Sequence, residues 1–299
     1  MHTIEIPDKK IKISMASCIE ELSHEEFEYL IFLLIQQHSN AITADQFKML
    51  FVSRLLRIRK SSSYYLMSED KREHLHDNLD RIITLVDSFF VPDKVDGKDI
   101  MALNLYFVKN MLPRIGKLIG PDDALTNVNF REYRDAVNYF HQYQVTKDEE
   151  FRNRFIAVLY RLRRRFLYIL KMLPDFDGQL RIHYSAKSNP IRLEKRARYI
   201  AKIPLHIKLG IELWFDSCNR FLREGSPEID GLAIDLSILY SGVEESSDPG
   251  IGLVGLLYSL SESKVFGELN ATDNTNLYDI MARLYQLKLD YDKQSKPKK

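Results

Sequence analysis

The stretch that decides the fold reads SHEEFEYLIFLLIQQH, residues 23–38. It opens with Ser23 and has Glu26 three residues later, the spacing of a capping box in which each side chain bonds the other residue's backbone N–H. Behind the box, apolar residues recur at the three-to-four-residue spacing of a helix: Phe27, Leu30, Ile31, Leu34 and Ile35. The stretch therefore predicts a capped helix with one buried side.

The same helical signature recurs along the rest of the chain. Thr43 and Gln46 form a second capping box, and Thr146 and Glu149 form a third. Proline and glycine separate the periodic segments, as expected of helix ends. Further helices are predicted over roughly 68–86, 100–112, 129–144, 146–170, 190–203, 205–221, 250–263 and 275–289. These patterns predict a mainly α fold, a multi-helix and bundle-like body.

Two short segments favour β-hairpins instead. Alternating residues 4–6 and 11–13 flank a turn that contains Pro7 and Asp8. Asp230-Gly231 lies between apolar positions near residue 229 and residue 232, which is a hairpin turn signal. We therefore expect one or two short hairpins beside the helices.

The domain organisation is predicted to be a single helical domain, residues 1–299. No repeat of fixed period and no low-complexity linker interrupts the chain. Its weakest joints are 113–123 and 174–189, where proline and glycine gather. A weak subdivision into 1–120, 121–225 and 226–299 is compatible with the pattern.

Composition bounds the class of protein. The chain has 299 residues, of which 45% are hydrophobic and 28% charged, which is ordinary for a globular protein. Cys18 and Cys218 stand apart, so two reduced and buried thiols are expected. The longest apolar run near the start, 29–35, is far shorter than the roughly 20 residues of a membrane span. Without a signal peptide, these features predict a soluble cytoplasmic protein.

Charge is spread unevenly along the chain. The net charge is −5 over 1–150, +12 over 151–210 and −6 over 211–299. The basic middle holds fifteen Lys and Arg against three Asp and Glu. Such a segment is typical of a nucleic-acid surface, but it can equally contact acidic parts of the same chain or of a partner protein.

The basic middle supplies the candidate binding residues. On the predicted helix 146–170, Arg161 and Arg165 are four residues apart and share a face, whereas Arg163 and Arg164 point elsewhere. That arrangement suits a helix surrounded by acidic partners as well as one that follows DNA. The candidate partner or nucleic-acid surface consists of Arg152, Arg154, Arg161, Arg163, Arg164, Arg165, Arg192, Lys195, Arg196 and Arg198.

Two sequence patterns match cofactor or metal motifs formally, but each has a simpler structural interpretation. Residues 250–255 match G-x-G-x-x-G, but no strand pattern or βαβ unit surrounds them, so close helix packing is the better reading. His74 and His76 are two residues apart, too far around a helix to bind one metal from one face. We therefore expect no catalytic residues, no cofactor and no metal, and a protein that is not an enzyme.

Several soft motifs together resemble an uncharacterised group of helical proteins that prophages encode near their tail genes. They are IEELSHEEF (19–27), GPDDAL (120–125) with Phe130, IAVLYR (156–161), Ile203-Pro204 with Trp214-Phe215, GLLYSLSES (255–263) with VFG (265–267), and NLYD (276–279) with LYQ (284–286). Members of the group are expected to have proline after the Leu-Tyr-Arg, where this chain has Leu162.

The resemblance implies a role in phage tail morphogenesis. The chain would then be a structural component or an assembly chaperone that binds other tail proteins, such as the tape-measure protein. Such a role needs surfaces for amphipathic helices, in the host cytoplasm or in the virion. The alternative left open by the residues is a nucleic-acid-binding protein that uses the basic segment 151–210.

Overall fold

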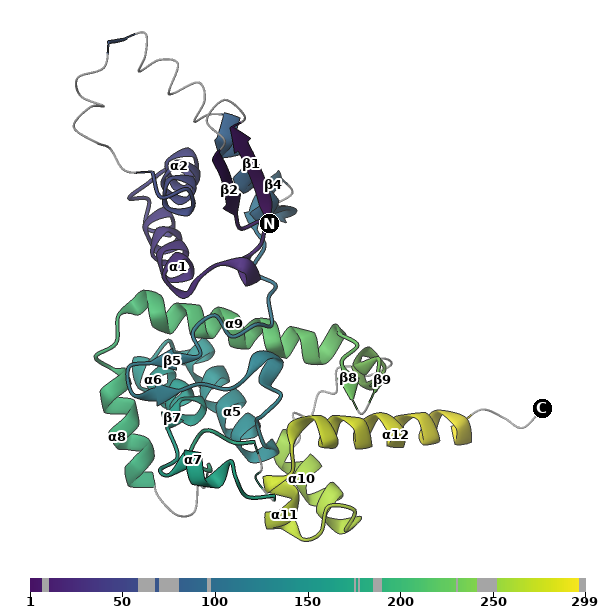
Figure 1. The fold of residues 1–299 in the computed structure, drawn as a ribbon. Helices are drawn as coiled ribbons and strands as arrows, with labels where there is room; N and C mark the ends of the chain where they lie inside the picture. The colour runs from purple at the N-terminus through teal and green to yellow at the C-terminus, as the bar shows by residue number, and fades with distance from the viewer. Residues whose placement is uncertain are drawn as a thin grey trace. The chain divides into compact units, whose positions relative to one another are not determined.

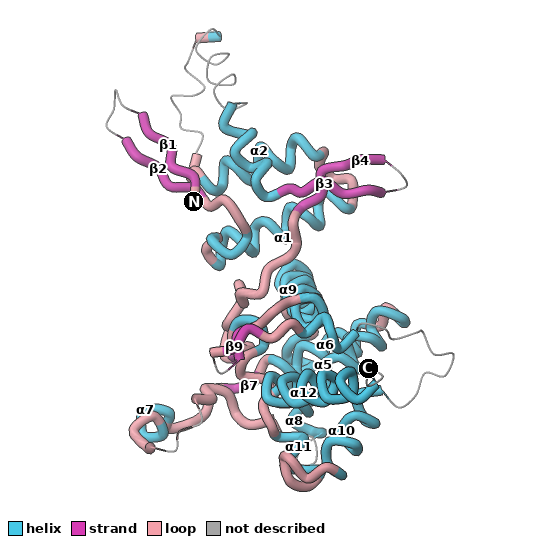
Figure 2. Tube along the Cα trace, turned by 90° about the vertical axis from the view of Figure 1, so that its right-hand side faces the viewer, coloured by secondary structure: helices cyan, strands magenta, loops and turns pink. Residues whose placement is uncertain are grey.

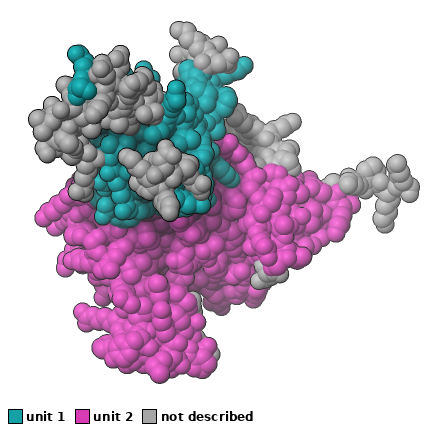
Figure 3. Space-filling view, turned by 45° about the horizontal axis from the view of Figure 1, so that its top comes forward, with its two compact units in different colours: residues 1–107, 205–214 teal, residues 108–204, 215–299 magenta. Residues whose placement is uncertain are grey.

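The computed structural model describes residues 1–6, 11–58, 68–69, 81–95, 98–174, 176, 178–184, 190–229, 231–240 and 252–295. The fold is mainly helical with a few short antiparallel strand pairs, as the sequence predicts (Figure 1). Contacts group the chain into two compact units (Figure 3). Unit 1 is Met1–Phe107 with Leu205–Trp214, and unit 2 is Val108–Pro204 with Phe215–Lys299. The single domain over residues 1–299 stays a prediction.

Unit 1 begins with the predicted hairpin. Strands β1 (His2–Ile6) and β2 (Ile11–Met15) are antiparallel, with Ile4 opposite Ile13. A 3-10 turn, Ile19–Glu21, leads into the helices. The hairpin is therefore confirmed at the predicted residues.

The two helices of unit 1 begin at the predicted capping boxes. Helix α1 (His24–His38) starts after Ser23, whose backbone N–H donates to Glu26 at 2.9 Å while Glu26 N–H donates to the Ser23 hydroxyl at 3.3 Å. Helix α2 (Ala44–Leu55) starts after the equivalent pair Thr43 and Gln46. Both boxes are confirmed.

Aromatic rings form much of the unit 1 core. Phe51 and Phe89 meet edge to face with their ring centroids 5.1 Å apart, and Phe27 and Phe107 at 5.5 Å. All four side chains are buried. Edge-to-face pairs add about 1 kcal/mol beyond area burial, so these rings stabilise the contacts of α1 and α2.

The predicted helix over 100–112 is wrong. Strands β3 (Phe90–Val95) and β4 (Lys98–Leu103) pair here, with Pro92 opposite Met101, and 104–113 is irregular. Asp96-Gly97 between the strands is a hairpin signal that outweighs helical spacing, and a two-stranded sheet tolerates proline on its edge. Of the helix predicted over 68–86, residues 70–80 lie outside the described part, and Thr84–Phe89 is a 3-10 helix.

Unit 2 is built on a group of packed helices. They are α5 (Phe130–Thr146), α6 (Glu149–Leu159), α8 (Pro190–Ile200) and the residues from Phe215 onward of α9 (Leu205–Glu224). The rings of Phe140, Phe155 and Phe215 meet between them at centroid distances of 4.8–5.4 Å. The predicted helices at 129–144, 190–203 and 205–221 are confirmed within a few residues.

The single helix predicted over 146–170 is wrong. Helix α6 begins after Asp148, which caps it in place of the Thr146–Glu149 pair, and ends at Leu159. The next residues form β7 (Arg161–Leu162), and a separate short helix α7 (Leu167–Leu170) follows. Strand β7 extends a sheet made by β5 (Arg114–Ile115) and β6 (Leu118–Ile119). Pairing with residues about forty positions earlier in the chain therefore overrides local helical spacing.

The last part of unit 2 contains the second predicted hairpin. Strands β8 (Glu228–Ile229) and β9 (Leu232–Ala233) pair around Gly231, whose positive φ of 79° suits glycine. A 3-10 helix (Leu236–Tyr240) follows. Helices α10 (Gly252–Glu262), α11 (Leu269–Asn274) and α12 (Leu277–Ser295) complete the described chain. Within that part, no helix combines the length and the apolar composition that crossing a bilayer requires.

Candidate binding site

A buried ion-pair cluster lies in the middle of unit 2. The Glu132 carboxylate accepts a hydrogen bond from Arg161 and another from Arg181, each at 2.7 Å. Arg181 also donates to the backbone carbonyl oxygens of Leu159 at 2.8 Å and Asn127 at 2.9 Å. The cluster therefore ties the end of α6 to the start of α5 and to the segment that contains Arg181.

This cluster carries an excess positive charge in the interior. Two guanidiniums face one carboxylate, and all three side chains are at most 4% exposed. Burial lowers the pKa of Arg161 to about 10, because desolvation penalises its charged form, although the Glu132 carboxylate opposes that shift. Arg161 is still charged at neutral pH. It is buried, however, and so is not the exposed helical residue that the sequence predicted.

A groove of about 890 Å³ opens beside Arg161. The exposed cations that line it are Lys117, Arg163, Arg165, Arg192 and Lys195. Its apolar lining comes from Leu118, Leu162, Ile182, Pro190 and Leu193, together with the rings of Tyr139, Tyr184 and Tyr199. We call this feature the basic groove. Its lining combines positive charge with apolar and aromatic surface.

Three parts of the fold bring the cations together. Lys117 lies in the turn between β5 and β6, and Arg163 lies just after β7, where it forms an isolated bridge with Arg181. Arg192 and Lys195 are three residues apart on α8, a spacing that places side chains on the same face. The groove therefore depends on the end of α6 at Leu159, because a continuous helix would not place Arg163 beside α8.

Asp135 is the one carboxylate among the described residues that line the basic groove, and it has partners of its own. Asp135 accepts a hydrogen bond from the Tyr184 hydroxyl at 2.7 Å and lies 3.6 Å from the Arg134 guanidinium. Burial, and then the charge of Asp135, raise the pKa of Tyr184, so its hydroxyl stays protonated. Asp135 therefore leaves most of the positive charge of the groove uncompensated.

Other predicted surface residues are engaged within the protein. Arg152 is buried and pairs with Glu149 at 2.8 Å. Arg154 bonds Glu194 at 2.9 Å and so joins α6 to α8. Neither residue lines the basic groove.

The remaining predicted residues divide between the groove and its surroundings. Arg196 lines the groove, but its Nε donates to the Ala157 carbonyl oxygen at 2.9 Å, and burial lowers its pKa. Arg164 donates to the Gln179 carbonyl oxygen at 3.3 Å. Arg198 is exposed on α8 and does not line the groove. Six of the ten predicted residues thus gather at one place.

Sequence reasoning missed several residues of this site. Lys117 lies outside the strongly basic segment, and Tyr139 and Tyr184 belong to no motif. Glu132 and Arg181 pair across 49 residues, a separation that leaves no local signal. The helical spacing of α5 does place Tyr139 beside Asp135, and this was the one available clue.

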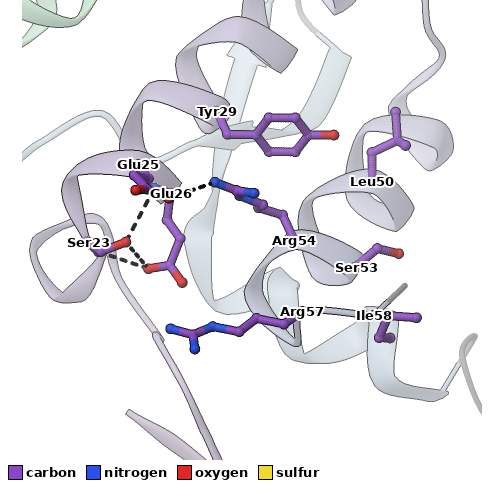
Figure 4. Close-up of a pocket in the computed structure, with 9 residues that line it drawn as sticks. All are labelled: Ser23, Glu25, Glu26, Tyr29, Leu50, Ser53, Arg54, Arg57 and Ile58. Atoms are coloured by element: carbon purple, nitrogen blue, oxygen red, sulfur yellow. Dashed lines mark hydrogen bonds and ion pairs between the residues drawn. The ribbon is translucent and has the colours of Figure 1, made fainter. Parts of the chain in front are cut away.

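A second cavity lies in unit 1 between α1 and α2 and measures about 630 Å³ (Figure 4). Glu25 and Arg54 pair across it at 3.1 Å, and Arg54 also lies over the Tyr29 ring. Glu26 is committed to the α1 capping box. Because Glu25, Glu26 and Arg54 already have partners within unit 1, this cavity is a weaker candidate for a binding site than the basic groove.

Two further expectations from the sequence concern metal ligands and the burial of Cys18 and Cys218. That part of the chain contains no group of three His, Cys, Asp or Glu arranged to hold a metal. Cys218 is buried, and burial raises the pKa of its thiol, but Cys18 is exposed, so the expectation of two buried thiols is wrong for Cys18. His74, His76 and Gly250 lie outside the described residues.

Comparisons with protein-family models, curated proteins and solved structures give no significant match.

Proposed function

We propose that this chain is a non-enzymatic binding protein whose basic groove holds an acidic, partly apolar segment of a partner protein. The observation that carries the proposal is the composition of the groove. Its described lining combines five exposed cations with apolar and aromatic side chains, and the one carboxylate among these residues is already partnered. An amphipathic segment could bury its apolar side on that lining and pair its carboxylates with the cations.

The candidate partners are phage tail proteins, including the tape-measure protein. The resemblance to proteins of prophage tail regions supports this choice, and so does the abundance of exposed apolar side chains outside the groove. The proposal places the chain in the cytoplasm of the host cell, as an assembly chaperone or as a component that enters the virion.

The test is a direct binding assay with purified tail proteins encoded beside this chain, after nuclease treatment. Helix α8 offers a matched pair of variants. Arg192→Glu reverses a charge in the basic groove, and Arg198→Glu reverses an exposed charge on the same helix outside it. We expect Arg192→Glu to weaken binding at least tenfold and Arg198→Glu to leave it nearly unchanged. Absence of binding to any tail protein, or equal effects of the two variants, would overturn the proposal.

Nucleic acid is the second candidate occupant. The tyrosine rings beside the groove cations are the observation that favours it, because bases stack on aromatic side chains while cations contact phosphates. Against it, the chain as a whole carries a net charge of only +1. Binding of single-stranded nucleic acid that falls steeply with salt and is lost in Arg192→Glu would replace the protein partner by this occupant.

A further inference from the structure

Helix α7 and its flanking turns expose an unusual number of large apolar side chains. The exposed fractions are 67% for Phe166, 71% for Tyr168, 46% for Ile169, 82% for Met172 and 52% for Leu173. We call these five residues the α7 tip. The segment stands out from the other helices of unit 2 in Figure 2. Exposed apolar residues that occur singly are ordinary, but a cluster of this kind marks a surface that contacts something.

The backbone of this segment is internally hydrogen-bonded, although its side chains are exposed. Phe166 has a φ of +53°, a conformation that bulky residues rarely adopt, and its carbonyl oxygen accepts from the N–H groups of Ile169 and Leu170 at 2.9 and 3.1 Å. Leu167 is buried and anchors the segment. Met172 N–H donates to the Ile169 carbonyl oxygen at 3.0 Å. Its polar backbone groups are thus largely paired, which an apolar environment requires.

Positive charge flanks the α7 tip. Residues 151–174 contain no Asp and no Glu; Asp175 and Asp177 follow them, so residues 163–177 hold four Lys and Arg against two Asp, a net charge of +2. Arg163, Arg165 and Lys171 are exposed, and within the described part of the chain none of the three forms an ion pair. Long cationic side chains beside an apolar tip can keep their charges in the headgroup region while the tip enters the acyl boundary.

We propose that the α7 tip docks onto the surface of an anionic lipid bilayer. The charge of its flanks is complementary to anionic headgroups, which attract nearby Lys and Arg. Tyrosine, here Tyr168, is a residue that favours the membrane interface. The five exposed side chains differ in size and shape, so a protein partner would need a pocket fitted to each of them, whereas a lipid surface needs none. This contact is peripheral; it shares Arg163 and Arg165 with the basic groove but does not use Arg192 and Lys195 of α8.

The experiment is sedimentation of the full chain with vesicles of phosphatidylcholine and phosphatidylserine, and with vesicles of phosphatidylcholine alone. We expect binding to the anionic vesicles only, and we expect it to weaken as salt rises. Phe166→Ser with Met172→Ser should reduce binding at least tenfold. Val145→Ser removes a 70% exposed apolar side chain elsewhere in unit 2 and should leave binding unchanged.

A second variant, Met172→Ser, and a thermal melt separate loss of vesicle binding from loss of folding. Met172→Ser alone alters the most exposed residue of the tip and carries little risk to folding, which a thermal melt checks. Failure of the wild-type chain to bind anionic vesicles overturns the proposal, as does binding that the tip variants leave intact. If the wild-type chain does not bind lipid and the tip variants lose a complex with a tail protein, the tip contacts a protein partner instead. Arg192→Glu reports on the basic groove separately, so the two proposals can fail independently.

Discussion

The guanidinium of Arg181 lies 2.7 Å from a carboxylate oxygen of Glu132, and neither side chain exceeds 1% exposure. Arg161 holds the other oxygen of the same carboxylate. Glu132 therefore neutralises part of two buried charges that come from segments far apart in the sequence. Because desolvated charges are costly without partners, the arrangement makes this carboxylate essential to the fold of unit 2.

Glu132→Gln should lower the free energy of unfolding by about 3–5 kcal/mol, because it leaves two guanidiniums buried without a counter-charge. Urea denaturation followed by circular dichroism measures the change. Glu224→Gln is the matched control, since it breaks an exposed ion pair with Arg220 and should cost less than about 1 kcal/mol. Equal effects of the two substitutions would show that the buried cluster does not stabilise unit 2.

Stability should fall as the pH rises above about 9. Burial raises the pKa of the Cys218 thiol above 9.0 and the pKa values of the Tyr160 and Tyr278 hydroxyls above 10.0. These groups stay protonated in the folded chain while they ionise in the unfolded chain, so their contribution is fully present below the ordinary pKa and is lost above it. Each contributes up to about 1.4 kcal/mol per pH unit in that range.

Unfolding free energies measured at a series of alkaline pH values would check this slope. Tyr160→Phe should flatten the decline above pH 10, at the cost of the hydrogen bond that the Tyr160 hydroxyl donates to the Leu112 carbonyl oxygen. Tyr168→Phe alters an exposed ring and should leave the slope as it is. A slope that Tyr160→Phe does not change would contradict the assignment.

Gly120→Ala should destabilise the chain by about 1–3 kcal/mol through overpacking. A Cβ at this position would lie 2.6 Å from the Tyr160 ring, which is fully buried and has little room to move. Gly178→Ala is the control for added volume, because its Cβ would meet nothing within 4 Å, although its φ of +71° adds some strain. Thermal melts measure the loss of stability in each variant. A larger loss for Gly178→Ala than for Gly120→Ala would argue against close packing at Gly120.

The two thiols should react at very different rates with a thiol reagent. Cys18 is exposed, whereas Cys218 is buried and its raised pKa disfavours the reactive thiolate. One thiol per chain should therefore be modified quickly under native conditions, and the second only in denaturant. Fast modification of Cys218 in a Cys18→Ser variant under native conditions would show that α9 opens readily.

Some elements could be predicted because their signals are local. The Ser23–Glu26 and Thr43–Gln46 boxes sit within one turn of the helices that they start, and both were confirmed with their hydrogen bonds. The hairpin at residues 4–13 and the turn at Gly231 also rest on neighbouring residues. The mainly helical class follows from many such segments.

The basic groove was predicted only in part. Charge counting along the sequence found the segment that holds Arg163, Arg165, Arg192 and Lys195. It could not distinguish these exposed residues from Arg152 and Arg161, which are buried in ion pairs. Exposure depends on what packs against a side chain, and residues distant in sequence decide that.

By itself, then, the sequence determined the helix starts, the hairpin turns and the presence of a basic segment, since each depends on interactions within a few residues. Only the tertiary structure decided that α6 ends at Leu159, that Arg161 is buried against Glu132, and that the α7 tip is exposed. The physical reason is the range of the interactions. Strand β7 pairs with β6 about forty residues earlier, and Arg181 reaches a carboxylate 49 residues away, so neither leaves a periodic trace in the chain.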